Sequence, residues 1–129
     1  MIAGIGTDII DIERVHRMLS NTTGDRFMRR VLTDAEYSIC IGRPGRVAEF
    51  VAGRFAAKEA VVKGLGCGIG KDVSFHDIEI LPDKQGKPHV RLSDNARANL
   101  RLQDHVKLHI TISHTATNAV AFAVVEYAE

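Results

Sequence analysis

The stretch VAEFVAGRFAAKEAVVKG, residues 47–64, decides the fold of this 129-residue chain. Its many alanines predict a long helix. The glycine-rich run GLGCGIG at residues 64–70 then suits a left-handed cap that ends the helix. One face of the helix is nearly bare, because small residues recur on it at a spacing of four: Ala52, Ala56, Ala60 and Gly64. We therefore expect a central helix that another element approaches closely.

The N-terminal third of the chain predicts a strand followed by short helices. The opening MIAGIGTDII, residues 1–10, is rich in β-branched and small residues, which favours a strand. Asp11 is a good N-cap for the amphipathic stretch that follows. A second short helix is expected at about residues 25–32, and Thr33 with Glu36 predicts a capping box at the start of a third.

The C-terminal half predicts two β-hairpins with a helix between them. The segments VSFHDIEIL and KPHVRL flank PDKQGK, with Gly86 in the turn. Ser93 can cap a helix that runs to about Leu102. Apolar and polar residues then alternate from Val106 to Ile112, HTATN forms a turn, and AVAFAVVEY returns. The predicted fold class is α+β, with a mostly antiparallel sheet, a long central helix and short N-terminal helices.

The composition is that of a globular chain. Hydrophobic residues make up 45% and charged residues 26%, which argues against disorder. A formal net charge of +1 does not indicate any class of binding partner. No apolar run approaches the roughly 18 residues that span a bilayer, so we expect a cytoplasmic protein with no membrane partner. The length favours a single domain, residues 1–129. Cys40 and Cys67 lie far apart with no CxxC pairing, which suggests neither a zinc site nor a disulfide scaffold.

Two carboxylates stand where an ordinary structural role does not fully explain them. Asp8 ends the first strand, where it either caps a helix or binds something. Glu59 shares a helix face with Phe55 and Val62, which favour the core, so its carboxylate needs a partner. Lys63, one turn further on, could form an ion pair with it. The alternative is a metal, because two carboxylates without a His or Cys cluster favour a hard ion such as Mg²⁺.

The glycines at alternate positions of residues 64–70 expose backbone amides to any nearby anion. The run does not match a phosphate-binding loop of the GxxxxGK[ST] type, and it does not follow a strand as a dinucleotide fingerprint must. A helix cap and a turn explain most of these glycines without a ligand. Beside Lys63 and Lys71, phosphate binding is the rival interpretation.

Ser113, His114 and Thr115 end a predicted strand. A nucleophilic triad is disfavoured, because neighbouring side chains on a strand point to opposite faces. Their hydroxyl and imidazole groups suit either capping of the turn or contact with a phosphate.

Arginine is concentrated in one part of the chain. Residues 14–54 contain eight arginines, no lysine and four acidic residues. Aromatic residues for base stacking are scarce there, so nucleic acid is a poor candidate partner. An acidic protein surface is a better candidate partner. The alternative is that the arginines form a solvent-exposed helix face that binds no partner. Five of these arginines fall on or beside the first helices: Arg14, Arg17, Arg26, Arg29 and Arg30.

Three blocks of the sequence together resemble a known family. GIGTDIIDIERV, FVAGRFAAKEAVVKGLGCGIG and ISHTATNAVAFAVVE are similar, in order and spacing, to the signature blocks of the holo-acyl-carrier-protein synthases, the small bacterial class of 4′-phosphopantetheinyl transferases. The resemblance implies the fold of that family. It also implies transfer of the phosphopantetheine arm of coenzyme A to a serine of apo-acyl carrier protein, with release of adenosine 3′,5′-bisphosphate, as a step that serves fatty acid and lipid biosynthesis.

The resemblance also assigns roles to residues. It implies that Asp8 and Glu59 hold Mg²⁺ and that Lys63 contacts phosphate or stabilises the leaving group. The proton acceptor stays open between Glu59, Asp8 and a metal-bound water. Other positions are similar to those that line the coenzyme A site: Arg54, Gly66, Gly68, Ser113, His114 and Thr115. A third set is similar to the face that binds the carrier protein: Arg14, Met18, Arg26, Phe27 and Arg30.

Two departures and two alternatives accompany this resemblance. Gly64 stands where alanine is usual, and Cys67 replaces a frequent hydroxyl residue, which puts one phosphate hydrogen bond in doubt. The same carboxylates could support a Mg²⁺-dependent pyrophosphate hydrolase, and the arginines alone could serve a non-enzymatic module that binds acidic proteins. A chain this short has little depth for a closed site. The family resemblance accordingly implies a homotrimer with each site between neighbouring subunits.

Overall fold

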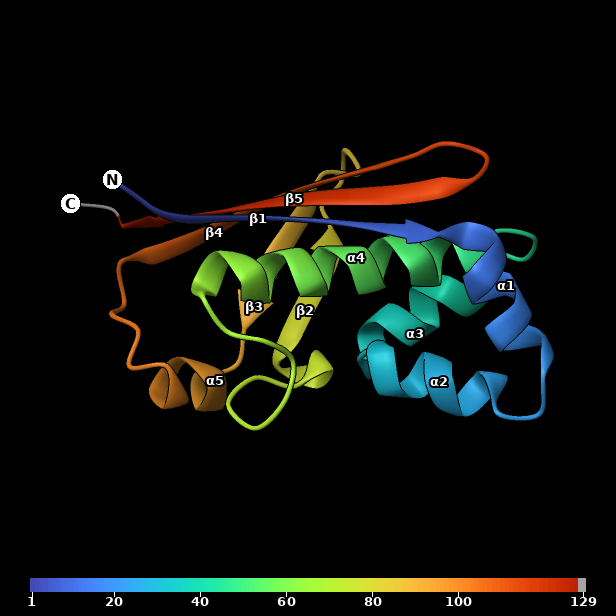
Figure 1. Ribbon diagram of the computed structural model, residues 1–129, viewed down its shortest axis with the longest axis horizontal. Helices are drawn as coiled ribbons and strands as arrows, with labels where there is room; N and C mark the ends of the chain where they lie inside the picture. The colour runs from blue at the N-terminus through green and yellow to red at the C-terminus, as the bar shows by residue number, and fades with distance from the viewer. Residues whose placement is uncertain (128–129) are drawn as a thin grey trace.

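The computed structural model describes residues 1–127 and confirms the α+β fold class (Figure 1). Its elements follow one another in this order: β1 (Ile2–Asp11), α1 (Ile12–Ser20), α2 (Gly24–Val31), α3 (Asp34–Ile41), α4 (Val47–Leu65), the short 3₁₀ helix η1 (Phe75–Asp77), β2 (Ile78–Pro82), β3 (Pro88–Leu92), α5 (Asp94–Asn99), β4 (Val106–His114) and β5 (Asn118–Tyr127).

The strands form two antiparallel sheets. The larger sheet has the strand order β1-β5-β4, and the β2-β3 hairpin forms the smaller one. Figure 1 shows the helices on one side of the larger sheet, with α4 running beneath β1 and β5. Among residues 1–127, no helix covers the opposite face of that sheet. Both predicted hairpins are therefore confirmed.

Helix α4 and strand β1 meet backbone to backbone, as the bare face predicted. A Cβ added to Gly6 would lie 2.0 Å from the carbonyl oxygen of Ala60. One added to Gly4 would lie 2.0 Å from the carbonyl oxygen of Gly64. No side chain fits at either glycine, so β1 is held directly against α4.

The predicted caps are present. Asp11 accepts hydrogen bonds from the amides of Glu13 and Arg14 at the start of α1. Thr33 and Glu36 form the complete capping box of α3. Helix α4 ends at Gly66, whose φ of +80° is the left-handed conformation that glycine adopts without strain.

Helix α5 is shorter than its sequence predicted. It ends at Asn99 because Arg101 takes a left-handed conformation with φ +54°. The amide of Leu102 then bonds the carbonyl of Arg97, and the Leu102 side chain packs against the main core. Burial of Leu102 thus turns the chain out of the helix where the sequence has no glycine to signal a stop.

The hydrophobic core has two parts, one on each half of α4. The first lies between the C-terminal half of α4, the sheets and α5, and includes Val61, Ile78 and Ile80. The second joins the N-terminal half of α4 to helices α1 to α3, and includes Val15 and Val31. Among residues 1–127, no helix is long and apolar enough to cross a membrane.

Candidate functional site

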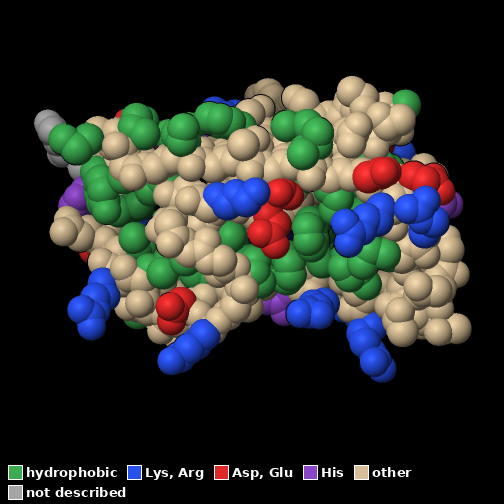
Figure 2. Space-filling model, in the orientation of Figure 1, with side chains coloured by type: hydrophobic (Ala, Val, Ile, Leu, Met, Phe, Trp, Pro, Cys, Tyr) green, Lys and Arg blue, Asp and Glu red, His purple; other side chains and the backbone are tan. Residues whose placement is uncertain are grey.

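Asp8, Glu59 and Lys63 gather where β1 lies along α4. The Lys63 ammonium lies 3.1 Å from Asp8 Oδ1 and donates to the Thr7 carbonyl at 3.0 Å. Figure 2 shows side chains of opposite charge side by side in the middle of this face. Lys63 therefore pairs with Asp8 across two elements, and not with Glu59 one turn earlier on its own helix as the ion-pair alternative expected.

Glu59 is half-buried beside this pair and forms no ion pair among the described residues. Burial raises the pKa of its carboxyl group, the charge of Asp8 raises it further, and the charge of Lys63 lowers it. The two carboxylates are thus close enough to repel each other. A cation placed between them would relieve both burial and repulsion.

The donor set on this face fits Mg²⁺. It offers two carboxylates and no thiol or imidazole, and Mg²⁺ binds through one or two carboxylates and completes its shell with water and phosphate oxygens. The part of the chain that the structure describes has no group of three or more His, Cys, Asp or Glu side chains that could hold a metal alone. A Mg²⁺ bound here would take its remaining ligands from water or from phosphate oxygens.

In the glycine loop after α4, the amides of Gly68 and Ile69 make no hydrogen bond within residues 1–127. The Gly66 amide donates to the Lys63 carbonyl and the Cys67 amide to the Val62 carbonyl, so both close the end of α4. The Gly68 amide makes no hydrogen bond within residues 1–127, and open space surrounds its Cα. Gly68 is thus the glycine whose amide can reach an anion, whereas Gly66 serves the helix cap.

A separate, positively charged hollow of about 230 Å³ lies near the N-terminal end of α4. Arg54 and His114, both predicted to contact coenzyme A, line it together with Arg43 and Arg46. The hollow holds one carboxylate, that of Glu49, which lies 2.8 Å from His114 Nδ1. Three guanidinium groups around one carboxylate give a site for an anion.

Arg54 is the most confined of these groups. Only 8% of it is exposed, its Nε donates to the Ile80 carbonyl at 3.1 Å, and its guanidinium carbon lies 4.4 Å from the centre of the Phe50 ring. Burial lowers its pKa, and the charge of Glu36 acts in the opposite direction. No carboxylate within residues 1–127 pairs with Arg54 directly, and a buried guanidinium without one is well suited to an external phosphate.

The other two residues of the Ser113–Thr115 group lie apart from this hollow. Ser113 neighbours His114 on β4 and points to the opposite face of the sheet. Thr115 Oγ1 accepts hydrogen bonds from the amides of Thr117 and Asn118 and so caps the turn between β4 and β5. Within one chain, only His114 of the three lines the charged hollow.

The two halves of the predicted site face away from each other in a single chain. At about 100° per residue, Arg54 and Lys63 lie on opposite sides of α4, and Arg54 and Glu59 are about 140° apart. The carboxylate face borders β1, at one edge of the larger sheet, whereas His114 belongs to β4 at the other edge. Within one chain, the two halves therefore lie on different sides of α4.

The five residues predicted to bind a carrier protein come together on α1 and α2. Arg14, Arg26 and Arg30 are exposed and form no ion pair within the described residues, whereas Arg29 is held by Asp25 at 2.9 Å. Met18 is half-buried, as is Phe27, whose ring centre lies 6.3 Å from that of Phe55. Unpaired arginines beside a partly exposed apolar strip suit an acidic partner with an apolar ridge.

Sequence reasoning missed two groups of residues. Arg43 and Arg46 line the charged hollow, and the turn GRPGR that holds them before the long helix was the available signal. Lys58 and Glu36 form a fully buried ion pair at 2.6 Å. The signal for that pair was Lys58 itself, a charge among alanines one turn after Arg54.

Comparison with known proteins identifies the family. The family model of the 4′-phosphopantetheinyl transferase superfamily matches residues 4–125. The chain belongs to this superfamily. It is 46% identical over 127 residues to the holo-[acyl-carrier-protein] synthase of Bacillus cereus strain AH187, which covers 98% of this chain and 97% of the relative.

Solved structures of the family agree with the fold. The holo-(acyl-carrier-protein) synthase of Bacillus anthracis strain Ames, in complex with CoA (3′,5′-ADP), is 45% identical with a TM-score of 0.84 and covers 99% of both chains. The synthase of Neisseria meningitidis is 36% identical with a TM-score of 0.88, covering 98% of this chain and 99% of its own. The predicted transferase fold is therefore confirmed.

Proposed function

We propose that this chain is a holo-acyl-carrier-protein synthase, which transfers 4′-phosphopantetheine from coenzyme A to a serine of apo-acyl carrier protein. The observation that carries the proposal is that this member of the superfamily combines the Asp8, Glu59 and Lys63 cluster with an arginine-lined hollow and an arginine face. The family model covers residues 4–125, which supports one transferase domain over residues 1–129.

In the reaction, the serine hydroxyl oxygen forms a bond to the β-phosphorus of coenzyme A. The P–O bond to the other phosphate breaks, adenosine 3′,5′-bisphosphate leaves with the bonding electrons, and the serine proton passes to a base. We assign Asp8 and Glu59 as the ligands of Mg²⁺, which would neutralise charge on the diphosphate oxygens. Lys63 is placed on the same face to bind a diphosphate oxygen, and the Gly68 amide can add a hydrogen bond.

The arginine-lined hollow suits the nucleotide end of coenzyme A. Arg43, Arg46 and Arg54 supply bidentate donors for the 3′-phosphate, and His114 can add another. This assignment explains why Arg54 is buried without a carboxylate partner. Ser113 and Thr115 have no assigned contact in this arrangement within one chain.

The opposite orientation of the two halves supports a site shared between subunits. The uncovered face of the larger sheet provides an interface for such an assembly: Ile5 and Ile9 of β1 are 61% and 65% exposed, and Phe122 of β5 is 41% exposed beside them. A contiguous exposed apolar face of this kind is typical of subunit contacts. We propose a homotrimer, the number that the family resemblance implies. The cytoplasmic location stays a prediction.

The mass of the carrier protein tests the transferase activity. Incubation of the protein with coenzyme A, Mg²⁺ and apo-carrier should add one phosphopantetheine to the carrier and release one adenosine 3′,5′-bisphosphate. Release of the bisphosphate without any carrier would favour the hydrolase alternative. Binding of the carrier with no change in its mass would favour the non-enzymatic binding module.

Mixing of two inactive variants tests the shared site. Glu59→Gln damages the carboxylate face and Arg46→Ala the hollow, so each homo-oligomer should be impaired. After subunit exchange, some mixed interfaces combine an intact face with an intact hollow, and activity should return to a fraction of the unmodified level. No recovery in samples where mass spectrometry confirms exchange would show that each chain forms its own site. Ile9→Asp should abolish assembly and activity together.

A further inference from the structure

Lys58 is completely buried in α4, directly before Glu59 in the sequence. Its Nζ donates to Glu36 Oε1 at 2.6 Å, to the Val31 carbonyl at 2.7 Å and to the Phe75 carbonyl at 3.0 Å. Burial lowers the pKa of Lys58, and the charge of Glu36 opposes this effect. Three acceptors match the three N–H groups of an ammonium ion, whereas a neutral amine has two. Lys58 is therefore held as a cation.

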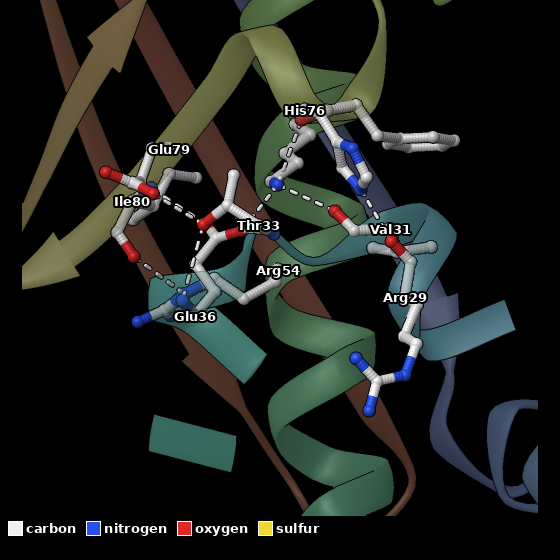
Figure 3. Close-up of polar contacts among 10 residues, drawn as sticks. Arg29, Val31, Thr33, Glu36, Arg54, His76, Glu79 and Ile80 are labelled. Carbon is white, nitrogen blue, oxygen red and sulfur yellow. Dashed lines mark hydrogen bonds and ion pairs between the residues drawn. The ribbon is translucent and has the colours of Figure 1, made fainter. Parts of the chain in front are cut away.

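Through the Val31 carbonyl, Lys58 contacts the C-terminal end of helix α2. Val31 is the last residue of α2, and the last carbonyls of a helix have no partner within it. A second of these carbonyls, that of Arg29, bonds Nε2 of His76 (Figure 3). A carbonyl only accepts, so Nε2 of His76 carries the hydrogen. Two side chains from outside α2 thus hold its C-terminal end, where a cation is also favoured by the helix dipole.

Helix α2 needs tertiary contacts to hold its position: Met28 and Val31 pack into the second core, and the two polar contacts hold its C-terminal end. It has only eight residues, and its N-cap residue, Thr23, makes no side-chain capping bond. A helix this short is not stable on its own. The same helix presents Arg26 and Arg30 to solvent, and these are two of the residues proposed to bind the carrier.

Glu36 fixes the other side of Lys58. Its Oε2 accepts from the Ile80 amide at 2.8 Å, and its Oε1 accepts from the Thr33 amide at 2.8 Å. The Lys58 ammonium is consequently tied to α3 and β2 as well as to η1. These elements fix the position of the ammonium group, and the ammonium group in turn fixes the C-terminal end of α2.

We propose that Lys58 and His76 are positioning residues for carrier recognition: by holding the C-terminal carbonyls of α2, they set where Arg26 and Arg30 stand relative to Glu59 and Lys63. The inference rests on the proposed function of α2 as part of the carrier surface. Neither residue touches the substrates or the reacting atoms. Loss of either contact should therefore weaken recognition of the carrier and leave the binding of coenzyme A unchanged.

His76 provides the first test because it is exposed, so its variants should fold. We expect His76→Ala to raise the KM for apo-carrier about fivefold, since a lost hydrogen bond of about 1 kcal/mol has an effect of that size. The KM for coenzyme A should not change. His76→Gln, whose amide can donate to the Arg29 carbonyl, should recover most of the loss. His89→Ala is the matched control, because His89 is also exposed and bonded to Asp83, yet lies on β3.

Lys58 needs a variant that leaves no unpaired buried charge. In the double variant Lys58→Met with Glu36→Gln both charges are gone, whereas Glu36→Gln alone keeps the ammonium on the Val31 carbonyl. We expect the double variant, assayed well below its unfolding midpoint, to raise the carrier KM about tenfold, as loss of a charged hydrogen bond predicts. Glu36→Gln alone leaves the Lys58 ammonium without its countercharge and so lowers stability. Assayed well below its own unfolding midpoint, it should keep a carrier KM near the unmodified value, because the ammonium still holds the Val31 carbonyl.

The outcomes separate this inference from the proposed function. Arg30→Glu reverses a carrier-facing charge directly, so an unchanged carrier KM in that variant would remove α2 from the carrier surface and the inference with it. If Arg30→Glu raises the carrier KM while His76→Ala and the double variant do not, only the positioning role is wrong. Equal changes in the KM values for carrier and coenzyme A would indicate general damage to the fold and would also overturn it.

Discussion

Helix α4 carries two lysines five positions apart, each paired with a carboxylate from another element, and their surroundings differ completely. Lys58 and Glu36 are both 0% exposed and lie 2.6 Å apart, whereas the Lys63 and Asp8 side chains are 51% and 19% exposed and lie 3.1 Å apart. In the buried pair, all three N–H groups of the Lys58 ammonium already donate hydrogen bonds. The exposed pair keeps donors and acceptors for a ligand, so the same two residue types hold the fold in one place and offer chemistry in the other.

The largest difference should appear in stability. Lys58→Met leaves the Glu36 carboxylate buried without its partner, and we expect a loss of about 3–5 kcal/mol in the free energy of unfolding. Lys63→Met removes an exposed pair and should cost less than about 1 kcal/mol. Urea unfolding followed by circular dichroism measures both. Similar losses in the two variants would mean that the exposed pair also supports the fold.

For activity, changes on the exposed face should have larger effects than changes in the buried pair. Glu59→Gln removes one of the two carboxylates of the exposed face, and we expect transfer to the carrier to fall about 100-fold or more, the loss of a charge-stabilising contact in the transition state. Its stability should not fall, because the Glu59 carboxylate is half-buried and repelled by Asp8. Glu79→Gln is the control: Glu79 is also half-buried but accepts a hydrogen bond from Thr33 Oγ1 at 2.6 Å. A fully active Glu59→Gln enzyme would contradict the proposed site.

A change in the contact between the β1 and α4 backbones should affect the Lys63 to Asp8 pair and leave the Lys58 to Glu36 pair in place. Gly6→Ala forces β1 away from α4, and we expect a loss of about 2 kcal/mol together with a weaker Asp8 to Lys63 contact. Gly68→Ala meets open space and should leave stability within about 0.5 kcal/mol. Thermal midpoints compare the two. An unaltered midpoint in Gly6→Ala would show that the strand can move away without cost.

The smallest effect should come from a third pair, which is exposed throughout. Hydrogen bonds from Tyr37 and Arg29 lower the pKa of Asp25 below its usual value. Asp25 therefore stabilises the fold above about pH 4 and loses this contribution as the pH falls through its lower, folded-state pKa. Asp25→Asn should lower the unfolding midpoint slightly at pH 7, and the difference should shrink by about pH 2. A difference that does not depend on pH would exclude the charge as its cause.

The sequence predicts the parts of this molecule that depend on local patterns. The cap at Asp11, the capping box at Thr33, the end of α4 and both hairpins follow from neighbouring residues, and each is present. The sequence singled out Glu59 because a carboxylate among core residues needs a partner, and Asp8 because a carboxylate at the end of a predicted strand needs a cap or a ligand. The end of α5 was not found, since it depends on burial of Leu102 and on a left-handed arginine at 101.

The polar contacts between distant segments could not be predicted in the same way. Lys58 reaches Glu36 and the carbonyls of Val31 and Phe75 only after three elements have packed around it. Lys63 had a plausible partner four residues away, yet the closeness of β1 gave it Asp8. Local spacing states which pairs can form, and tertiary packing decides which of them do.

The glycines of β1 bear on how the site tolerates change. Because Gly4 and Gly6 meet the carbonyls of Gly64 and Ala60 directly, peptide atoms alone set the distance between β1 and α4. The spacing between the two backbones that carry Asp8 and Glu59 is thus set by main-chain contact. A residue larger than glycine at position 4 or 6 would therefore disturb the geometry of the site directly.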